Sequence, residues 1–79
     1  SNGMLMTKLA AKAVSDTILV ASRQDAISVR ARNSLAKAKI RFVGEISRER
    51  LAGIQGCGPG TTDELLEFRH RIEQGVATG

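Results

Sequence analysis

The residues best suited to chemistry in this sequence form a glycine-rich string followed by the start of a helical pattern. Gly56, Gly58 and Gly60 fall within five positions, and residues 61–64 (TTDE) follow directly. Glycine tolerates positive φ and lets the backbone approach a ligand closely, and the N–H groups at a helix N-terminus favour anions. The string therefore predicts a phosphate-binding hairpin or, as the alternative, a tight turn between two helices that binds nothing.

A second candidate surface is a basic stripe within the helix predicted at 29–38. Arg30, Asn33 and Lys37 recur at spacings of three and four residues, which places them on one face of a helix. Residues 28–50 contain seven Lys and Arg against two Glu, whereas the whole chain has a net charge of +4. Concentrated positive charge fits a polyanionic partner, and a solvated helix face is the alternative.

The remaining reactive residues form no catalytic or metal-binding pattern. Cys57 is the one cysteine and His70 the one histidine, and neither has partners at the spacing of a zinc site or a catalytic group. We expect Cys57 in the core and His70 on the surface. A single cysteine forms no internal disulfide, which favours a reducing compartment. These observations predict a cytoplasmic protein that is not an enzyme and has no metal and no cofactor.

Length and hydropathy limit the chain to one small domain. Its 79 residues are about half the usual domain size. No apolar run approaches the ~20 residues that cross a membrane, so no membrane partner is expected. Phe42 and Phe68 are the only aromatic residues, which is too few for the stacking platforms of single-strand binders. Binding to a duplex stays open.

Apolar residues recur with helical spacing almost throughout, which predicts an all-α chain. We expect helices at about 5–14, 29–38, 48–53 and 61–74, an irregular or short helical arm at 17–27, and a turn at Gly44. Ser28 and Ser47 are expected N-caps. Leu5, Leu9 and Ala13 are expected to share one stripe of the first helix. The expected core stripes are Ala31, Leu35 and Ala38, and Leu65, Phe68 and Ile72, with Ile40, Phe42, Val43 and Ile46 as a cluster of apolar anchors.

The last helix carries signals at both of its ends. Thr61 and Glu64 have the spacing of a capping box, in which a hydroxyl and a carboxylate each accept an end N–H. Gly75 is the expected C-terminal stop. The sequence thus predicts a helix that begins near Thr61 and ends before Gly75.

Several of these strings together resemble the C-terminal domain of the bacterial RNA polymerase α subunit. They are residues 27–35 (ISVRARNSL), 40–46 (IRFVGEI), Leu51 and 56–65 (GCGPGTTDEL), with 16–20 (DTILV) resembling the start of that domain. The resemblance covers about residues 16–76. It implies a compact bundle of four to five short helices that contains a helix-hairpin-helix (a SAM-like fold).

Residues outside this region are expected to be additions to the domain. Residues 4–15 form an extra N-terminal helix, 77–79 form a tail, and 1–3 before Met4 are interpreted as an expression scar. With Met4 or Met6 as the start, the large assembly domain of an α subunit is absent. The chain is then a stand-alone relative of the domain.

The resemblance also implies a function, which is binding to the minor groove and phosphates of A·T-rich double-stranded DNA in transcription. In that family the arginine and asparagine matched here by Arg30 and Asn33 reach the minor groove and its backbone. The implied DNA-binding residues are Arg30, Asn33, Ser34, Gly58, Gly60, Thr61 and Glu64. Lys37 and Arg41 are candidates for auxiliary phosphate contacts in place of a lysine that the family carries in the hairpin. The implied location is the nucleoid, with RNA polymerase or a transcription regulator as a further partner.

Two departures from the family pattern favour an alternative function. Gly60 stands where the family usually carries a lysine, and the link at 47–50 is about three residues shorter in a region that contacts activators. The alternative is a protein-interaction module of the same fold that has lost strong DNA affinity. It would use residues 1–20 to form a homodimer or to dock a partner.

Overall fold

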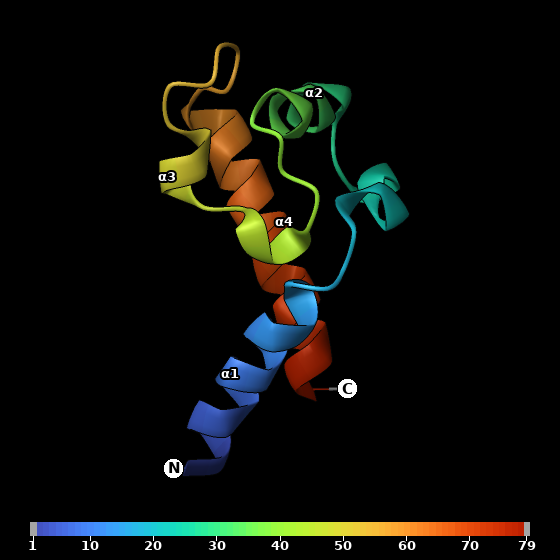
Figure 1. Cartoon of the computed structure of the whole chain (residues 1–79), viewed down its shortest axis with the longest axis vertical. Coiled ribbons are helices and arrows are strands. Elements are labelled where there is room, and N and C mark those ends of the chain that lie inside the picture. Colours follow the sequence, from blue (N-terminus) through green and yellow to red (C-terminus); the bar gives the residue numbers. More distant parts are fainter. Residues whose placement is uncertain (1, 79) are drawn as a thin grey trace.

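The computed structural model describes the backbone of residues 2–78 and the side chains of residues 9–75. Its elements in chain order are α1 (Asn2–Ser15), η1 (Val20–Ser22), η2 (Gln24–Ala26), α2 (Val29–Lys37), η3 (Val43–Glu45), α3 (Arg48–Leu51) and α4 (Pro59–Thr78), where η marks a short 3-10 turn (Figure 1). Within residues 2–78 there is no strand, only an antiparallel bridge between Leu19 and Phe42. The all-α prediction is confirmed.

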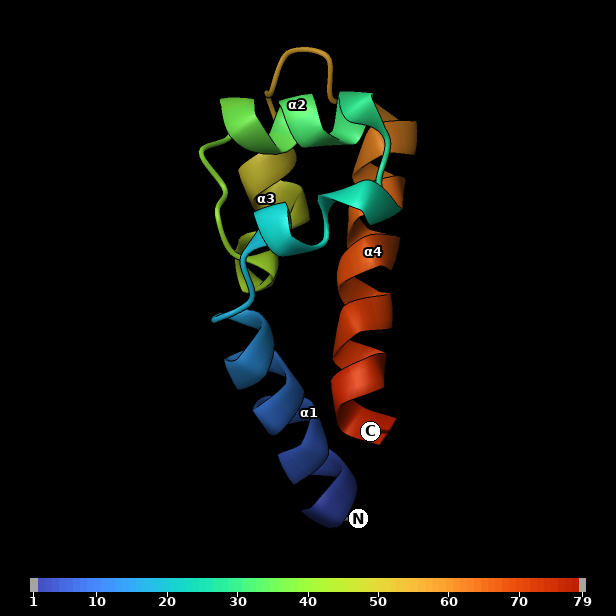
Figure 2. The ribbon, with the colours of Figure 1, turned by 90° about the vertical axis from the view of Figure 1, so that its right-hand side faces the viewer.

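The long helix α4 organises the molecule. It begins after the glycine-rich turn at one end of the molecule and runs past the core and alongside α1 (Figures 1 and 2). The longest dimension of the molecule is 40 Å. The first helix, α1, lies beside the C-terminal half of α4, while α2 and α3 pack near its N-terminal half. The short helices therefore pack around one end of α4, and α1 and the C-terminal half of α4 extend side by side from that end.

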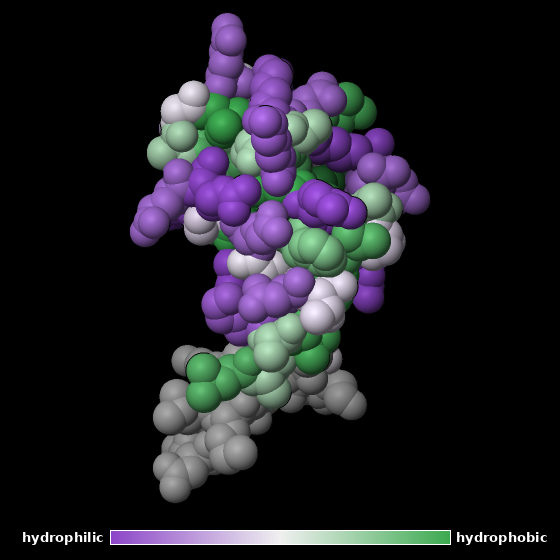
Figure 3. Space-filling model, viewed as in Figure 1, coloured by the Kyte–Doolittle hydropathy of each residue, from purple (hydrophilic) through white to green (hydrophobic). Residues whose placement is uncertain are grey.

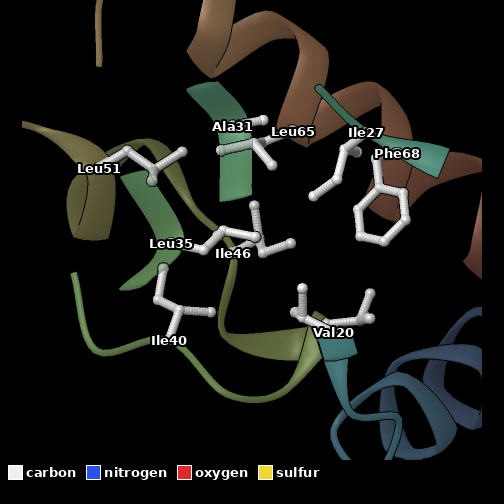
Figure 4. Packing of buried hydrophobic residues seen from close by; sticks show 10 residues of the cluster. Val20, Ile27, Ala31, Leu35, Ile40, Ile46, Leu51, Leu65 and Phe68 are labelled. Carbon is white, nitrogen blue, oxygen red and sulfur yellow. The ribbon is translucent and has the colours of Figure 1, made fainter. Parts of the chain in front are cut away.

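The core lies between α2, α3 and the N-terminal half of α4. Figure 4 shows side chains from these elements converging around Ile46, which is fully buried. The buried cluster consists of Val20, Ile27, Ala31, Leu35, Ile40, Val43, Ile46, Leu51, Leu65 and Phe68. The buried stripes predicted for α2 and α4 are confirmed, with Ala38 and Ile72 partly buried at the edge of the cluster.

The described residues of the stripe predicted for the first helix lie on the surface. Leu9 is 63% exposed and Ala13 is also exposed, whereas Ala11 and Ser15 are buried one turn apart. Leu5 lies outside the residues whose side chains are described. Small residues at the buried positions let α1 approach α4 closely.

A polar network fixes α1 on α4. The hydroxyl of Ser15 donates to Glu73 Oε2 at 2.7 Å. Arg69 Nε donates to the same carboxylate oxygen at 3.0 Å, and Arg69 Nη1 donates to the carbonyl of Ile46 at 2.7 Å. Ser15 is buried, and its hydroxyl also lies 3.0 Å from the carbonyl of Lys12. The network links α1, α4 and the segment before α3.

Both predicted serine caps are confirmed. The Ser28 hydroxyl accepts from the N–H of Ala31 at 3.1 Å at the start of α2. The Ser47 hydroxyl accepts from the N–H of Arg50 at 3.1 Å at the start of α3. Each cap satisfies one of the N–H groups that a first helical turn leaves without an acceptor.

Both predicted ends of α4 are wrong. The helix begins at Pro59, because proline lacks an N–H and its fixed φ suits the first helical position. It continues through Gly75 to Thr78. Glycine only lowers helix propensity by about 1 kcal/mol, and the packing of α1 supports this part of α4.

The irregular arm predicted at 17–27 is confirmed, and it consists of η1 and η2. The N–H of Val43 donates to the carbonyl of Ile18 at 2.8 Å, and the N–H of Val20 donates to the carbonyl of Arg41 at 2.8 Å. These bonds hold the arm against the segment that contains η3. The arm is therefore an ordered wall of the structure.

The predicted turn at Gly44 is confirmed, and the close approach of two segments explains the glycine. Gly44 lies in η3, where its backbone contacts the end of α1. A Cβ at this position would lie 2.9 Å from Asp16 Cα and would overlap the Asp16 carboxylate. Only a residue without a side chain fits here without moving the backbone.

We expect Gly44→Ala to lower the free energy of unfolding by about 1–3 kcal/mol, because relief of the overlap requires the backbone to move. The matched control is Gly75→Ala, since a Cβ there meets no atom within 4 Å. That change should be neutral or raise the free energy of unfolding by about 0.5–1 kcal/mol. Urea denaturation followed by circular dichroism measures both, and equal midpoints would contradict the close approach.

Candidate nucleic-acid interface

The basic stripe of α2 lies on the surface, as predicted. Arg30, Asn33 and Lys37 are exposed, while Ala31 and Leu35 on the other face are buried. Within the part of the chain whose side chains are described, those of Arg30 and Asn33 form no hydrogen bond or ion pair. Hydrophilic residues gather over this end of the molecule (Figure 3). The stripe is therefore available to a ligand.

Lys37 is partly committed to the chain itself. Its Nζ donates to the carbonyl of Gln55 at 3.1 Å, which ties α2 to the turn before α4. An ammonium group has three donors, so the bond leaves capacity for a phosphate. Lys37 thus positions the turn, and its auxiliary phosphate contact stays a prediction.

Positive φ in the turn between α3 and α4 occurs at Gly53, with φ of 80°, and at Gly56, with φ of 86°. Gly58 and Gly60 have no positive φ, and a Cβ at either one would meet no atom within 4 Å. Gly56 therefore shapes the turn, whereas Gly58 and Gly60 leave the backbone open to a ligand. The assignment of a helix-hairpin-helix stays a prediction.

The N-terminus of α4 presents free backbone donors. The carbonyl of Gly58 accepts from the N–H of Thr62 at 3.0 Å, which makes Gly58 the residue before the first helical turn. The N–H groups of Gly60 and Thr61 have no acceptor one turn earlier, and the first turn contains no acidic residue. This end of a helix of 20 residues carries partial positive charge.

The starts of α2 and α4 meet in one hollow of about 500 Å³. It is lined by Ser28, Val29, Arg30, Gly60, Thr61 and Glu64. The hollow brings the free guanidinium of Arg30 to the backbone donors of α4. Arginine and helix N-termini are both common contacts to nucleic-acid phosphates, so the arrangement suits an anionic backbone.

Sequence reasoning missed Val29, which also lines the hollow. It is 63% exposed, although valine is usually buried. Its position directly after the N-cap Ser28 and before Arg30 was the available signal, because the first residue of a capped helix often points away from the core. An exposed methyl surface beside Arg30 can contact sugars or base edges.

Glu64 acts as a cap for a helix other than its own. Its carboxylate accepts from the N–H of Ser28 at 2.8 Å and from the Ser28 hydroxyl at 2.8 Å. The predicted capping box with Thr61 is therefore wrong. The carboxylate joins the starts of α2 and α4, so Glu64 positions Arg30, and a direct contact to DNA stays a prediction.

Two predicted contact residues are buried. Ser34 is 2% exposed and Thr61 is 8% exposed. Ser34 lies on α2 beside the core residues Ala31 and Leu35, which are also buried. A direct contact of the Ser34 side chain with DNA does not fit this burial, and Thr61 offers its backbone N–H rather than its hydroxyl.

Arg41 lies apart from the hollow. Its side chain is exposed, with its guanidinium carbon 5.8 Å from the centroid of the Phe42 ring. Its backbone N–H donates to Glu45 Oε2 at 3.2 Å. Because Arg41 does not line the hollow, its auxiliary phosphate contact stays a prediction.

The other reactive residues lie as expected. Cys57 is partly buried against the core, with its Sγ 3.4 Å from Thr62 Oγ1. His70 is exposed. Among the described residues, no group of three His, Cys, Asp or Glu side chains could hold a metal ion. No described helix is long and apolar enough to span a membrane.

Comparisons of the chain with protein-family models, with curated proteins and with solved structures found no match. The function therefore rests on the sequence and on the geometry of this interface.

We expect Glu64→Ala to lower the free energy of unfolding by about 1–2 kcal/mol, because Ser28 loses both bonds to a charged acceptor at an exposed site. The matched control is Glu67→Ala, one turn later on α4, where the carboxylate lies 3.8 Å from Arg71 in an exposed pair. That change should stay within about 0.5 kcal/mol. Urea denaturation measures both, and an equal loss in the two variants would contradict the link between α2 and α4.

Proposed function

We propose that this chain is a non-enzymatic module that binds double-stranded DNA in transcription, as a relative of the C-terminal domain of the RNA polymerase α subunit. The observation that carries the proposal is the free, exposed Arg30 beside the N-terminal donors of α4 in one hollow. The fold supports it, because the basic stripe and the turn occupy the same end of the molecule (Figure 2).

The proposed contacts divide into base-reading and positioning groups. Arg30 enters the minor groove of A·T-rich duplex, where a narrow groove concentrates negative potential. Asn33, one helical turn along α2, donates a hydrogen bond to the groove or the backbone. The N–H groups at Gly60 and Thr61 bind a phosphate on the strand beside Arg30.

Few cationic side chains lie on this surface, so its affinity for DNA should be modest and should fall as the salt concentration rises. Arg30 is free, Lys37 shares its ammonium with Gln55, and Glu64 offsets part of the local positive charge. Each phosphate contact adds roughly −0.9 to the slope of log K against log salt. A slope of about −2 to −3 fits two or three such contacts.

The second candidate is a protein-interaction module that forms a homodimer or docks a partner through residues 1–20. The observation in its favour is that Leu9 is 63% exposed and Val14 is 41% exposed on α1. Figure 3 shows apolar surface in this region, below the polar end of the molecule. Against it, α1 already packs on α4 of the same chain, so we place it second. Sedimentation of the whole chain separates a homodimer from a monomer.

We expect Arg30→Ala to weaken binding to an A-tract duplex by about 1–3 kcal/mol, because the groove loses its inserted cation. Fluorescence anisotropy at several salt concentrations measures the affinity and its salt slope. The proposal fails if the unaltered chain does not bind the duplex at low salt.

The matched control is Arg71→Ala, which removes the same charge from a side chain that does not line the hollow. Its duplex affinity should stay within about twofold of the unaltered chain. Equal weakening by the two substitutions would indicate attraction by net charge, without a specific interface.

A further inference from the structure

We propose that the groove between the 17–27 arm and the C-terminal half of α4 binds an acidic peptide segment that carries apolar anchor residues. The groove has a volume of about 470 Å³. Its apolar lining residues, here called the floor, are Ile18, Ala26, Phe68 and Ile72, and Arg23 of the arm and Arg71 of α4 also line it. It shares no lining residue with the hollow at the starts of α2 and α4, so the proposal does not depend on DNA binding.

The arginines make the groove selective for negative charge. Within the described side chains, that of Arg23 forms no hydrogen bond or ion pair. Arg71 has one ion-pair partner there, Glu67 at 3.8 Å, in a pair whose side chains are 63% and 61% exposed. Such a pair is weak in water. No acidic residue lines the groove, so a carboxylate next to the apolar floor gains both arginines as partners.

Both walls of the groove are held in place before a ligand arrives. One wall is α4 itself. The other is the arm, which is fixed by the Val43 N–H bond to the Ile18 carbonyl at 2.8 Å and by Arg32 Nε donating to the Gln24 carbonyl at 2.9 Å. A preformed site requires less ordering when it binds. The groove therefore has its shape before a ligand binds.

The shape favours a peptide over nucleic acid. Phe68 is 2% exposed and offers no ring face to a base, so Ile18, Ala26 and Ile72 supply the accessible apolar surface. The two arginines are the only polar side chains of the lining. Gly75 also lines the groove, and a Cβ there would meet no atom within 4 Å. The apolar side chains of an amphipathic segment can contact the apolar lining while its carboxylates pair with Arg23 and Arg71, so each lining group gains a partner.

Selection from a phage library of short random peptides against the whole chain tests the proposal. Enriched peptides should combine Asp or Glu with Leu, Ile, Met or Phe. Arg71→Ala should weaken a synthetic copy of such a peptide by about tenfold, the loss of one charge-assisted contact. Arg48→Ala removes an exposed arginine outside the groove and should leave its affinity within about twofold.

A second pair of variants tests the groove by its shape. Gly75→Leu places a large side chain in the lining of the groove and should abolish binding, while Gly75→Ala should retain most of it. Both remove a helical glycine, so neither should unfold the chain. Enrichment without acidic residues, no enrichment over bare support, or binding that survives Gly75→Leu would each overturn the proposal. Duplex affinity measured on the same variants should not change, which separates this outcome from failure of the DNA interface.

Discussion

The packing of α4 against α1, α2 and α3 is the constraint on which the rest of the structure depends. Leu65 and Phe68 bury one face of the helix in the core. A chain of this length has room for one core only, so each remaining element must find its place on the same helix. Two carboxylates at different positions along α4 then fix α1 and α2 by hydrogen bonds.

The two anchors are carboxylates on α4. Near the N-terminal end, Glu64 accepts two bonds from Ser28 and fixes the start of α2. Near the other end, Glu73 accepts from Ser15 and Arg69 and fixes α1. Bonds to a charged acceptor are about twice as strong as neutral ones. The first anchor determines the hollow beside Arg30, and the second supports the helical turn in which Gly75 lies.

The two candidate sites differ in chemistry because different elements face α4. At the N-terminal end, α2 brings a cation and α4 brings backbone donors, which together suit a phosphate backbone. Farther along, the arm brings apolar residues and arginines, which suit an acidic and apolar segment. The two hollows share no lining residue, so the proposed nucleic-acid interface and the proposed peptide groove are separate on one helix.

The sequence by itself determined the local features. Helical periodicity, the caps Ser28 and Ser47, and the stripe of Arg30, Asn33 and Lys37 follow from interactions within a few residues, and the structure retains them. Tertiary packing decided the rest. It buried Ser34, turned Glu64 from a cap of its own helix to a cap of α2, and extended α4 past Gly75. These outcomes depend on which helix approaches which face, and no local spacing contains that information.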